Sequence, residues 1–491
     1  MKKFRTFMFS FHRITGTIIS LLFLMWFISG LVLIYHPFPN VSKTARYEKM
    51  DVLPASLPEI GDILARIPNT DEIRGIRVNQ SQKQTVFYIS TKDSTYSICS
   101  DSLQEMLPIT SNSINQTVRK WIDAPIQKID TLYTNEQWIM YSRYNEVMPI
   151  YKYYFDDAEK HELYISALTG EVQQLTSRSE RIWAWLGAIP HKLYFPFLRQ
   201  HTNTWINILT IGGTICLVAS ITGIYVGISA FYKRFKNRKK IESPYKKPWY
   251  RWHHITGIIF GIFLSTWAFS GAMSLQKIPQ WAVKTHHDYK ITSSKIRGKR
   301  LSTDKYILDY RTLQSIYPNI KEIAWSHFQN RPIYNIIEGS RTLSIDASSK
   351  EIKELNLTEQ EILQSIRKIH GDSIPVTVSL INKYDEYYLS REEALPLPVY
   401  RVQVKDKDNS SYYINPRNGD YKYLNQNRKV KKWVFSGLHY LNIRFLVERP
   451  ALWTATIWIL CIGGIGVCTT GVWLGIRFFL RKVKAIFRKK Q

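Results

Sequence analysis

The chain has 491 residues, of which 45% are hydrophobic and 22% are charged, and its formal net charge at pH 7 is +28. A net charge of this size would favour nucleic-acid binding if it covered one folded surface. Much of it lies instead in three short basic segments that each adjoin an apolar run, at 2–13, 233–251 and 477–490. This pattern is typical of the cytoplasmic flanks of membrane-spanning helices, so membrane lipid is the expected surrounding and nucleic acid is excluded as a partner.

Four apolar runs are long enough to cross a membrane, at 12–35, 205–232, 253–275 and 454–479. Each exceeds the ~20 residues that span a ~30 Å hydrocarbon core. With the basic segments in the cytoplasm, both termini lie inside and the two long loops lie outside. The sequence therefore predicts a multi-pass protein of a bacterial inner membrane.

The predicted segments follow one another as a helix, a large loop and a helix, twice over. In chain order they are a first transmembrane helix at 1–35, a first periplasmic domain at 36–204, a second transmembrane helix at 205–232, a basic cytoplasmic linker at 233–252, a third transmembrane helix at 253–275, a second periplasmic domain at 276–453, and a fourth transmembrane helix with a basic tail at 454–491. The linker is too short to fold as a nucleotide-binding domain. Electrons or energy must therefore come from another partner.

Both loops contain short runs that alternate apolar and polar residues, separated by Asp, Asn, Ser and Gly. Four similar stretches begin at Gln84, Tyr151, Ile333 and Val399. Such alternation predicts meandering antiparallel strands. A helix-like stretch precedes each of them, most clearly from Thr358. We therefore expect two small α+β units in each periplasmic domain.

The apolar runs repeat in sequence. HRITG at 12–16 matches HHITG at 253–257, an offset of 241 residues that aligns His12 with His253. The second and fourth runs repeat at an offset of 248, which aligns His191 with His439 and a Thr-Gly pair with another. These registers predict an α-helical four-span bundle built from two parallel repeats, related by a pseudo-two-fold axis along the membrane normal.

These motifs resemble the PepSY-associated transmembrane helix proteins, often called iron-regulated membrane proteins. The resemblance rests on HRITG and HHITG, on the Thr-Gly pairs near the ends of spans two and four, on GAIPHKLYFPFLRQ at 187–200, and on turns such as SALTGEV and NPRNGDY. It implies extracytoplasmic PepSY domains, b-type haem in the membrane part, and reduction of ferric siderophores. Relatives of the PepSY domain also modulate peptidases, so a non-enzymatic module that binds or regulates a peptide or peptidase is the alternative.

Two histidine pairs recur at repeat-equivalent positions, and histidine is the natural haem ligand among these residues. Ligation needs two neutral imidazoles at one depth on facing helices. His12 and His253 both lie at the cytoplasmic start of their helices, and His191 and His439 both lie just before spans two and four on the outer side. We therefore expect two b-type haems, one per leaflet, with iron held by these four histidines. Pairing within each half is the alternative.

Other polar residues near the predicted sites receive subsidiary roles. Arg13 and Arg251 would suit the propionates of the inner haem. His254 points about 100° away from His253 around the helix, so only His253 is expected to face the axis. His36 has no counterpart in the second half, and the His286-His287 pair is a possible substrate contact.

The chain contains no phosphate-binding loop, no nucleophile with a base at motif spacing and no HExxH motif. No catalytic residue is therefore assigned. Asp385, Tyr387 and Tyr388 lie where the family often carries an aspartate followed by a tyrosine pair, and structural packing is their expected role. The preferred function is transmembrane electron transfer from a quinol or a separate reductase to a ferric siderophore on the periplasmic side.

Overall fold

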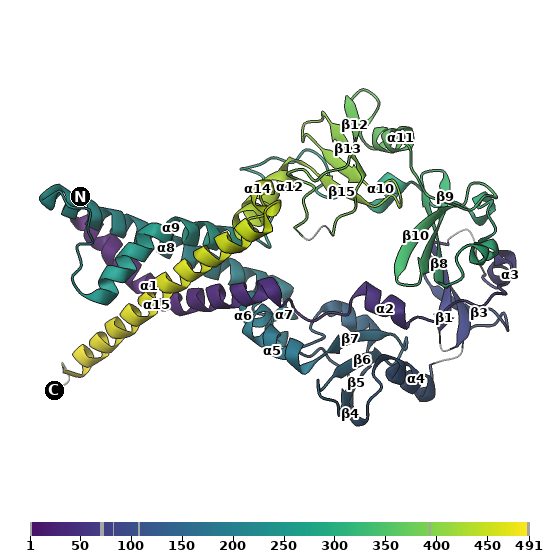
Figure 1. Cartoon of the computed structure of the whole chain (residues 1–491), viewed down its shortest axis with the longest axis horizontal. Coiled ribbons are helices and arrows are strands. Elements are labelled where there is room, and N and C mark those ends of the chain that lie inside the picture. The colour runs from purple at the N-terminus through teal and green to yellow at the C-terminus, as the bar shows by residue number, and fades with distance from the viewer. Residues whose placement is uncertain (1, 69–72, 82, 107–108, 392–393, 489–491) are drawn as a thin grey trace.

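The structure is a computed structural model that describes residues 2–68, 73–81, 83–106, 109–391 and 394–488. Four long helices form one end of the molecule and the β-sheets form the other (Figure 1). The helices are α1 (Lys2–Tyr35), α8 (Thr202–Arg238), α9 (Pro248–Met273) and α15 (Pro450–Arg488). All four are long and apolar enough to cross a membrane, in agreement with the number of spans that the sequence predicts. Both ends of the chain lie at the end of the bundle away from the sheets.

Each helix of the bundle packs against two others. α1 contacts α8 and α15, and α9 contacts the same two helices, so α1 and α9 face each other across the bundle. Small residues permit close approach, because a Cβ added at Gly213 of α8 would lie only 2.9 Å from the Cβ of Ala272 on α9. α9 begins at Pro248, a position where proline loses no intrahelical hydrogen bond.

The loop between α1 and α8 contains seven strands and six short helices in its described part. Its strands are β1 (Gly75–Ser81), β2 (Gln84–Ser90), β3 (Thr95–Cys99), β4 (Ile126–Leu132), β5 (Ile150–Phe155), β6 (Glu162–Ser166) and β7 (Val172–Thr176). Its α-helices are α2 (Lys43–Lys49), α3 (Ile60–Leu64), α4 (Ser111–Trp121), α5 (Arg178–Leu186), α6 (Ala188–Lys192) and α7 (Pro196–Arg199), with a 3₁₀ turn at Ser142–Val147. The helix α6 packs against α1 and so joins the loop to the bundle.

The loop between α9 and α15 follows a similar order. Its strands are β8 (Ile320–Phe328), β9 (Arg331–Glu338), β10 (Arg341–Asp346), β11 (Lys353–Glu354), β12 (Val376–Ile381), β13 (Val399–Val404), β14 (Ser411–Ile414) and β15 (Tyr421–Leu424). Its α-helices are α10 (Ser293–Arg297), α11 (Glu359–His370), α12 (Gln426–Lys431), α13 (Leu438–Tyr440) and α14 (Arg444–Val447), with 3₁₀ turns at Thr303–Lys305 and Tyr310–Ser315 and a π-helical turn at Lys432–Gly437.

The strands form three sheets. Two have four antiparallel strands, β4 to β7 and β12 to β15, each from one loop. The third has seven strands in the order β11-β10-β9-β8-β1-β2-β3, because β1 pairs with β8 through Val78 opposite Ile323. The loops are therefore joined by a shared sheet far from the bundle (Figure 1). The division of each loop into two PepSY-like units stays a prediction.

Alternating side chains explain how these sheets are covered. In the β12–β15 unit, Val402 and Tyr412 point into a core that also contains Ile362 and Ile366 of α11. α11 starts at a capping box in which Thr358 and Glu361 exchange hydrogen bonds with each other's backbone N–H. The described helix and strands therefore match the α+β pattern that the sequence predicts for this stretch.

Candidate functional site: two histidine pairs in the bundle

One histidine pair lies inside the bundle near the end that carries the termini. His12 projects from α1 and His253 from α9, the two helices that face each other across the bundle. Their ring centroids are 6.2 Å apart and their planes differ by 28°. The structure thus brings together two residues that the sequence aligned at an offset of 241.

The other pair lies at the opposite end of the bundle, next to the sheets. His191 is on α6 and His439 is on α13, and their ring centroids are 6.1 Å apart. Each short helix ends in a leucine with left-handed backbone, Leu193 and Leu441, both with a φ of 49°. This turn lets the chain reverse and enter the next spanning helix.

A tryptophan at the start of each following span holds the turn in place. The indole Nε1 of Trp205 donates to the Lys192 carbonyl at 2.7 Å, and that of Trp453 donates to the Tyr440 carbonyl at 3.0 Å. The two tryptophans were aligned by the sequence at an offset of 248. Their matching bonds fix His191 and His439 in matching positions.

All four histidines lie against a glycine of a neighbouring spanning helix. An added Cβ would lie 2.7 Å from His12 Cε1 at Gly223, 2.9 Å from His191 Cε1 at Gly30, 3.5 Å from His253 Cε1 at Gly471 and 3.6 Å from His439 Cε1 at Gly271. A side chain at any of these positions would meet the imidazole. At Gly223 and Gly30 the absence of a Cβ is therefore what allows the close approach of the ring, whereas a Cβ at Gly471 or Gly271 would be in ordinary van der Waals contact with it.

Each imidazole also interacts with a backbone carbonyl of the helix that carries its glycine. The carbonyl belongs to the residue four positions before that glycine. Nδ1 lies 3.0 Å from the Ala219 carbonyl for His12, 3.1 Å from the Trp26 carbonyl for His191 and 3.2 Å from the Val467 carbonyl for His253. His439 interacts with the Trp267 carbonyl, and its Nδ1 lies 3.1 Å from Ser270 Oγ. A carbonyl accepts only from N–H, so the proton sits on Nδ1 and Nε2 is left as a lone-pair donor.

The outer pair is neutral. Burial lowers the pKa of His191 to about 4 and, with a contribution from the neighbouring His191, that of His439 to about 3. Imidazole binds a metal in its neutral form. Both rings are therefore in the ligating protonation state throughout the physiological pH range.

The separation within each pair matches two imidazoles on one metal ion. A ligating nitrogen lies about 2 Å from the metal and about 1.1 Å from its own ring centre, so two rings on opposite sides of one ion have centroids about 6.2 Å apart. The observed separations are 6.2 Å and 6.1 Å. Rings in direct stacking contact would lie closer, as His36 does to Trp183 at 4.1 Å.

There is space beside both pairs. A cavity of about 670 Å³ adjoins the outer pair and is lined by His191, His439, Gly30, Gly271 and the rings of Trp26, Phe27 and Trp267, among others. Beside the inner pair, a Cβ added at Gly16 or Gly257 would meet nothing within 4 Å in the described part of the chain. Separation, tautomer and space together fit the haem that the family resemblance implies.

The remaining predicted residues lie elsewhere. His254 turns away from the pair, and its Nε2 lies 3.0 Å from the Gly227 carbonyl of α8. His36 stacks on Trp183. Arg13 lies over the Phe478 ring and Arg251 is exposed, so their role beside propionates stays a prediction.

The aspartate–tyrosine motif organises the loop between β12 and β13. The Asp385 carboxylate accepts from the backbone N–H groups of Tyr387 and Tyr388 at 2.8 Å each, and from the Tyr413 hydroxyl at 2.7 Å. These bonds suit the packing role that was expected for the motif.

Sequence reasoning missed the residues that orient the imidazoles. A hydroxyl residue precedes each of the four glycines, in the pairs Ser29-Gly30, Thr222-Gly223, Ser270-Gly271 and Thr470-Gly471. Thr470 Oγ1 lies 3.0 Å from His253 Nδ1, and Ser29 Oγ lies 3.4 Å from His191 Nδ1. Ser270 Oγ lies 3.1 Å from His439 Nδ1, whereas Thr222 Oγ1 donates to backbone carbonyls of its own helix. The occurrence of a hydroxyl residue before each glycine was a signal that could have identified the three that contact an imidazole.

Comparison with known proteins identifies the family of the chain. A search of curated proteins finds no match. The family model for the PepSY-associated TM region matches residues 77–370, more than half of the chain. Together with the four membrane-length helices and the β-sheets, this match shows that the chain is a membrane protein and belongs to the PepSY-associated transmembrane family.

Proposed function

We propose that this chain carries electrons across a bacterial inner membrane through two b-type haems and reduces a ferric siderophore on the periplasmic side. The observation that supports the proposal most directly is the pair of bis-imidazole arrangements at opposite ends of the bundle, with ring centroids 6.2 Å and 6.1 Å apart. His12 and His253 would hold the inner haem, and His191 and His439 the outer one. The repeated contacts also favour an origin by duplication into two parallel halves.

The protein's own part is to orient the ligands and keep water away. Carbonyl groups of neighbouring helices hold Nδ1 of His12, His191 and His253, which leaves Nε2 as the nitrogen that would bind the iron. When bound, the haems would supply one-electron redox chemistry at these two positions. Phe23 and Phe27 of α1 and Trp267 of α9 belong to the apolar core of the bundle that separates the pairs.

The positions of the pairs along the helices suit transfer across a bilayer. Gly30, against which His191 lies, is 18 residues from His12 on α1, which is about 27 Å along a helix at 1.5 Å per residue. A hydrocarbon core is ~30 Å thick. One pair therefore serves each side of the membrane.

The outer side is where a chelate would be reduced. Ferric chelates hold iron much more tightly than ferrous ones, because hard oxygen donors favour the more highly charged ion. One electron therefore releases the metal without destroying the chelator. The cavity beside the outer pair, about 670 Å³ in volume, is the space nearest to the outer histidines where such a chelate could approach.

Orientation follows the basic segments. The sheets would lie in the periplasm, and both termini and the connection between α8 and α9 in the cytoplasm. That connection, residues 239–247, is too short to contain a reductase domain. The electron donor would be a quinol or a separate reductase that reaches the inner pair.

Two measurements test the proposal. A reduced-minus-oxidised difference spectrum of the purified protein should show split bands of low-spin haem at two haems per chain. Dithionite-reduced protein, freed of excess reductant, should then be reoxidised by ferric siderophores of hydroxamate, catecholate or carboxylate type faster than by buffer and oxygen controls. Haem without reoxidation would refute the reductase activity, and a folded protein without haem would favour the peptide- or peptidase-binding alternative.

A further inference from the structure

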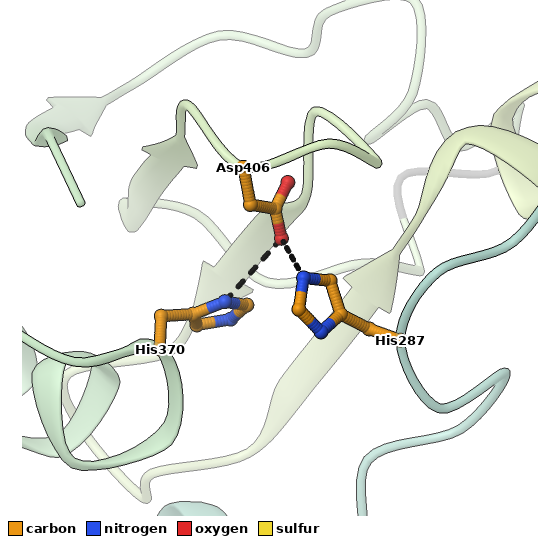
Figure 2. Close-up of side chains that lie close together, drawn as sticks. All are labelled: His287, His370 and Asp406. Carbon is orange, nitrogen blue, oxygen red and sulfur yellow. Dashed lines mark ion pairs between the residues drawn. The ribbon is translucent and has the colours of Figure 1, made fainter.

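Three metal-ligating side chains meet in the domain between α9 and α15, outside the bundle. His287 follows α9, His370 is the last residue of α11, and Asp406 lies in the turn between β13 and β14 (Figure 2). His370 Nδ1 is 3.3 Å and His287 Nε2 is 3.6 Å from the same oxygen, Oδ2 of Asp406. The three ligand atoms all lie within 4.8 Å of one another.

Two of these side chains are buried with unpaired atoms. The side chains of His370 and Asp406 are 2% and 1% exposed. Nevertheless His370 Nδ1 and Asp406 Oδ2 form no hydrogen bond within the described part of the chain. An unpaired buried polar group costs free energy, because its lost hydrogen bonds to water are not replaced. A cation between the two atoms would remove this cost for both.

The other nitrogen of His370 already has a partner. Its Nε2 lies 2.7 Å from the Tyr412 hydroxyl. With the proton on Nε2 and shared with Tyr412, Nδ1 offers a lone pair toward Asp406, which is the arrangement of a metal ligand supported by an outer hydrogen bond.

The corresponding turn of the other loop shows that Asp406 holds its own turn through its other oxygen, Oδ1. Between β5 and β6, Asp157 Oδ1 accepts from the His161 N–H at 2.9 Å, and Asp406 Oδ1 accepts from the Ser410 N–H at 2.8 Å in the same way. In the first turn the second oxygen of Asp157 pairs with the His161 ring at 2.6 Å. Ser410 cannot replace that ring, so Oδ2 of Asp406 faces the two histidines instead.

A second aspartate holds His287 in position. The side chain of Asp408 is fully buried, and its carboxylate accepts from the backbone N–H groups of His286 at 3.0 Å and His287 at 2.8 Å. The side chain of His287 remains 41% exposed. Asp408 therefore holds the backbone at His287, and the cluster is accessible to solvent on the His287 side.

We propose that His287, His370 and Asp406 bind one divalent transition-metal ion of the Zn²⁺ or Fe²⁺ class, with an open coordination position on the His287 side. Ligand atoms about 2.1 Å from a tetrahedral ion are about 3.4 Å apart, which the separations of 3.3 Å and 3.6 Å bracket. Two imidazoles and one carboxylate are a common ligand set for both ions. This site is independent of the bundle histidines and goes beyond the proposed electron transfer.

The test is Zn²⁺ binding to the full-length protein in detergent, purified without a histidine tag. Equilibrium dialysis and competition with a chromogenic chelator give the stoichiometry and the dissociation constant. His287→Ala, His370→Ala and Asp406→Asn should each weaken the binding of one Zn²⁺ per chain by at least roughly 100-fold, since each removes a direct ligand. The matched controls are Asp157→Asn and His161→Ala in the equivalent turn, which should bind Zn²⁺ as the wild type does.

Folding is controlled in two ways. Asp406→Asn keeps an oxygen for the Ser410 N–H, and His287→Ala changes a side chain that is substantially exposed. Excess Zn²⁺ should raise the melting temperature of the wild type and of both controls, and not that of the three ligand variants. Equal Zn²⁺ affinity in the wild type and the ligand variants, or no Zn²⁺ bound by the wild type, would show that the cluster is only an internal ion pair.

Discussion

The glycines beneath the histidines allow a test of ligand orientation that leaves the ligands themselves unchanged. Gly223 and Gly471 occupy equivalent Thr-Gly pairs on α8 and α15, and each supports one ring of the inner pair. They differ in the space available. A Cβ at Gly223 would lie 2.7 Å from His12 Cε1, whereas one at Gly471 would lie 3.5 Å from His253 Cε1.

The expected effects of alanine follow from these distances. Carbon atoms in contact are about 3.5–4.0 Å apart. In Gly223→Ala the His12 ring must therefore move away by about 1 Å, whereas in Gly471→Ala the His253 ring can keep its position. Both variants gain the same helix propensity, so their difference isolates overpacking, which costs about 1–3 kcal/mol. A shift of about 1 Å is also large against a metal–nitrogen bond of about 2 Å.

Absorption and electron paramagnetic resonance spectra of the purified variants provide the readout. Gly223→Ala should lose the inner haem or convert it to a high-spin form, while the outer haem keeps its low-spin signal. Gly471→Ala should resemble the wild type, and thermal unfolding should show Gly223→Ala as the less stable of the two. Indistinguishable spectra and stabilities for the two variants would refute the role given to the glycines.

Further expected outcomes concern the ligands, the orientation and one buried charge. His12→Ala and His253→Ala should each remove the same haem, as measured by haem content and redox titration, because both are proposed to hold the inner haem; loss of different haems would mean that pairs form within each half. Tyr133 is 75% exposed, and the cysteine of Tyr133→Cys should react with an impermeant maleimide in intact spheroplasts. Reaction only after lysis would mean that the sheets lie in the cytoplasm. Lys152→Met should destabilise the β4–β7 domain by about 3–5 kcal/mol in denaturant unfolding, because the buried ammonium has carboxylates at 2.9 Å and 3.0 Å. The control Lys128→Met, at an exposed pair, should cost much less, and equal losses would contradict this reasoning.

The spanning helices and the identity of the histidine pairs were predictable from sequence. Length and apolar composition determine whether a helix can cross a bilayer, and α1 needs no information from the rest of the chain. The offset of 241 placed His12 and His253 at equivalent depths, and only facing helices were then needed to bring them together. The contact of His12 with Gly223 depends on the relative rotation of α1 and α8, which the sequence pattern does not specify.

The arrangement of the sheets was not predictable in the same way. Alternation in β1 and β8 indicates strands, but an antiparallel edge carries the same unpaired N–H and C=O groups whatever its neighbour. The pairing of Val78 with Ile323 joins residues of different loops, and no local pattern marks that partnership. The His287–His370–Asp406 cluster was missed for the same reason, because its members come from separate segments and match no short motif.

Both halves of the chain contribute a histidine to each pair. His12 lies against α8 and His191 against α1, both within the first half, and His253 and His439 lie against α15 and α9 within the second. Each imidazole is therefore oriented by its own half, yet each pair is completed by the other half. A ligand bound between the rings would add to the helix contacts and to the β1–β8 pairing as a link between the halves. A group that binds only the assembled state stabilises that state by mass action. Haem binding at either pair should therefore favour the assembled bundle, in which the histidines of the other pair also lie at ligating distance.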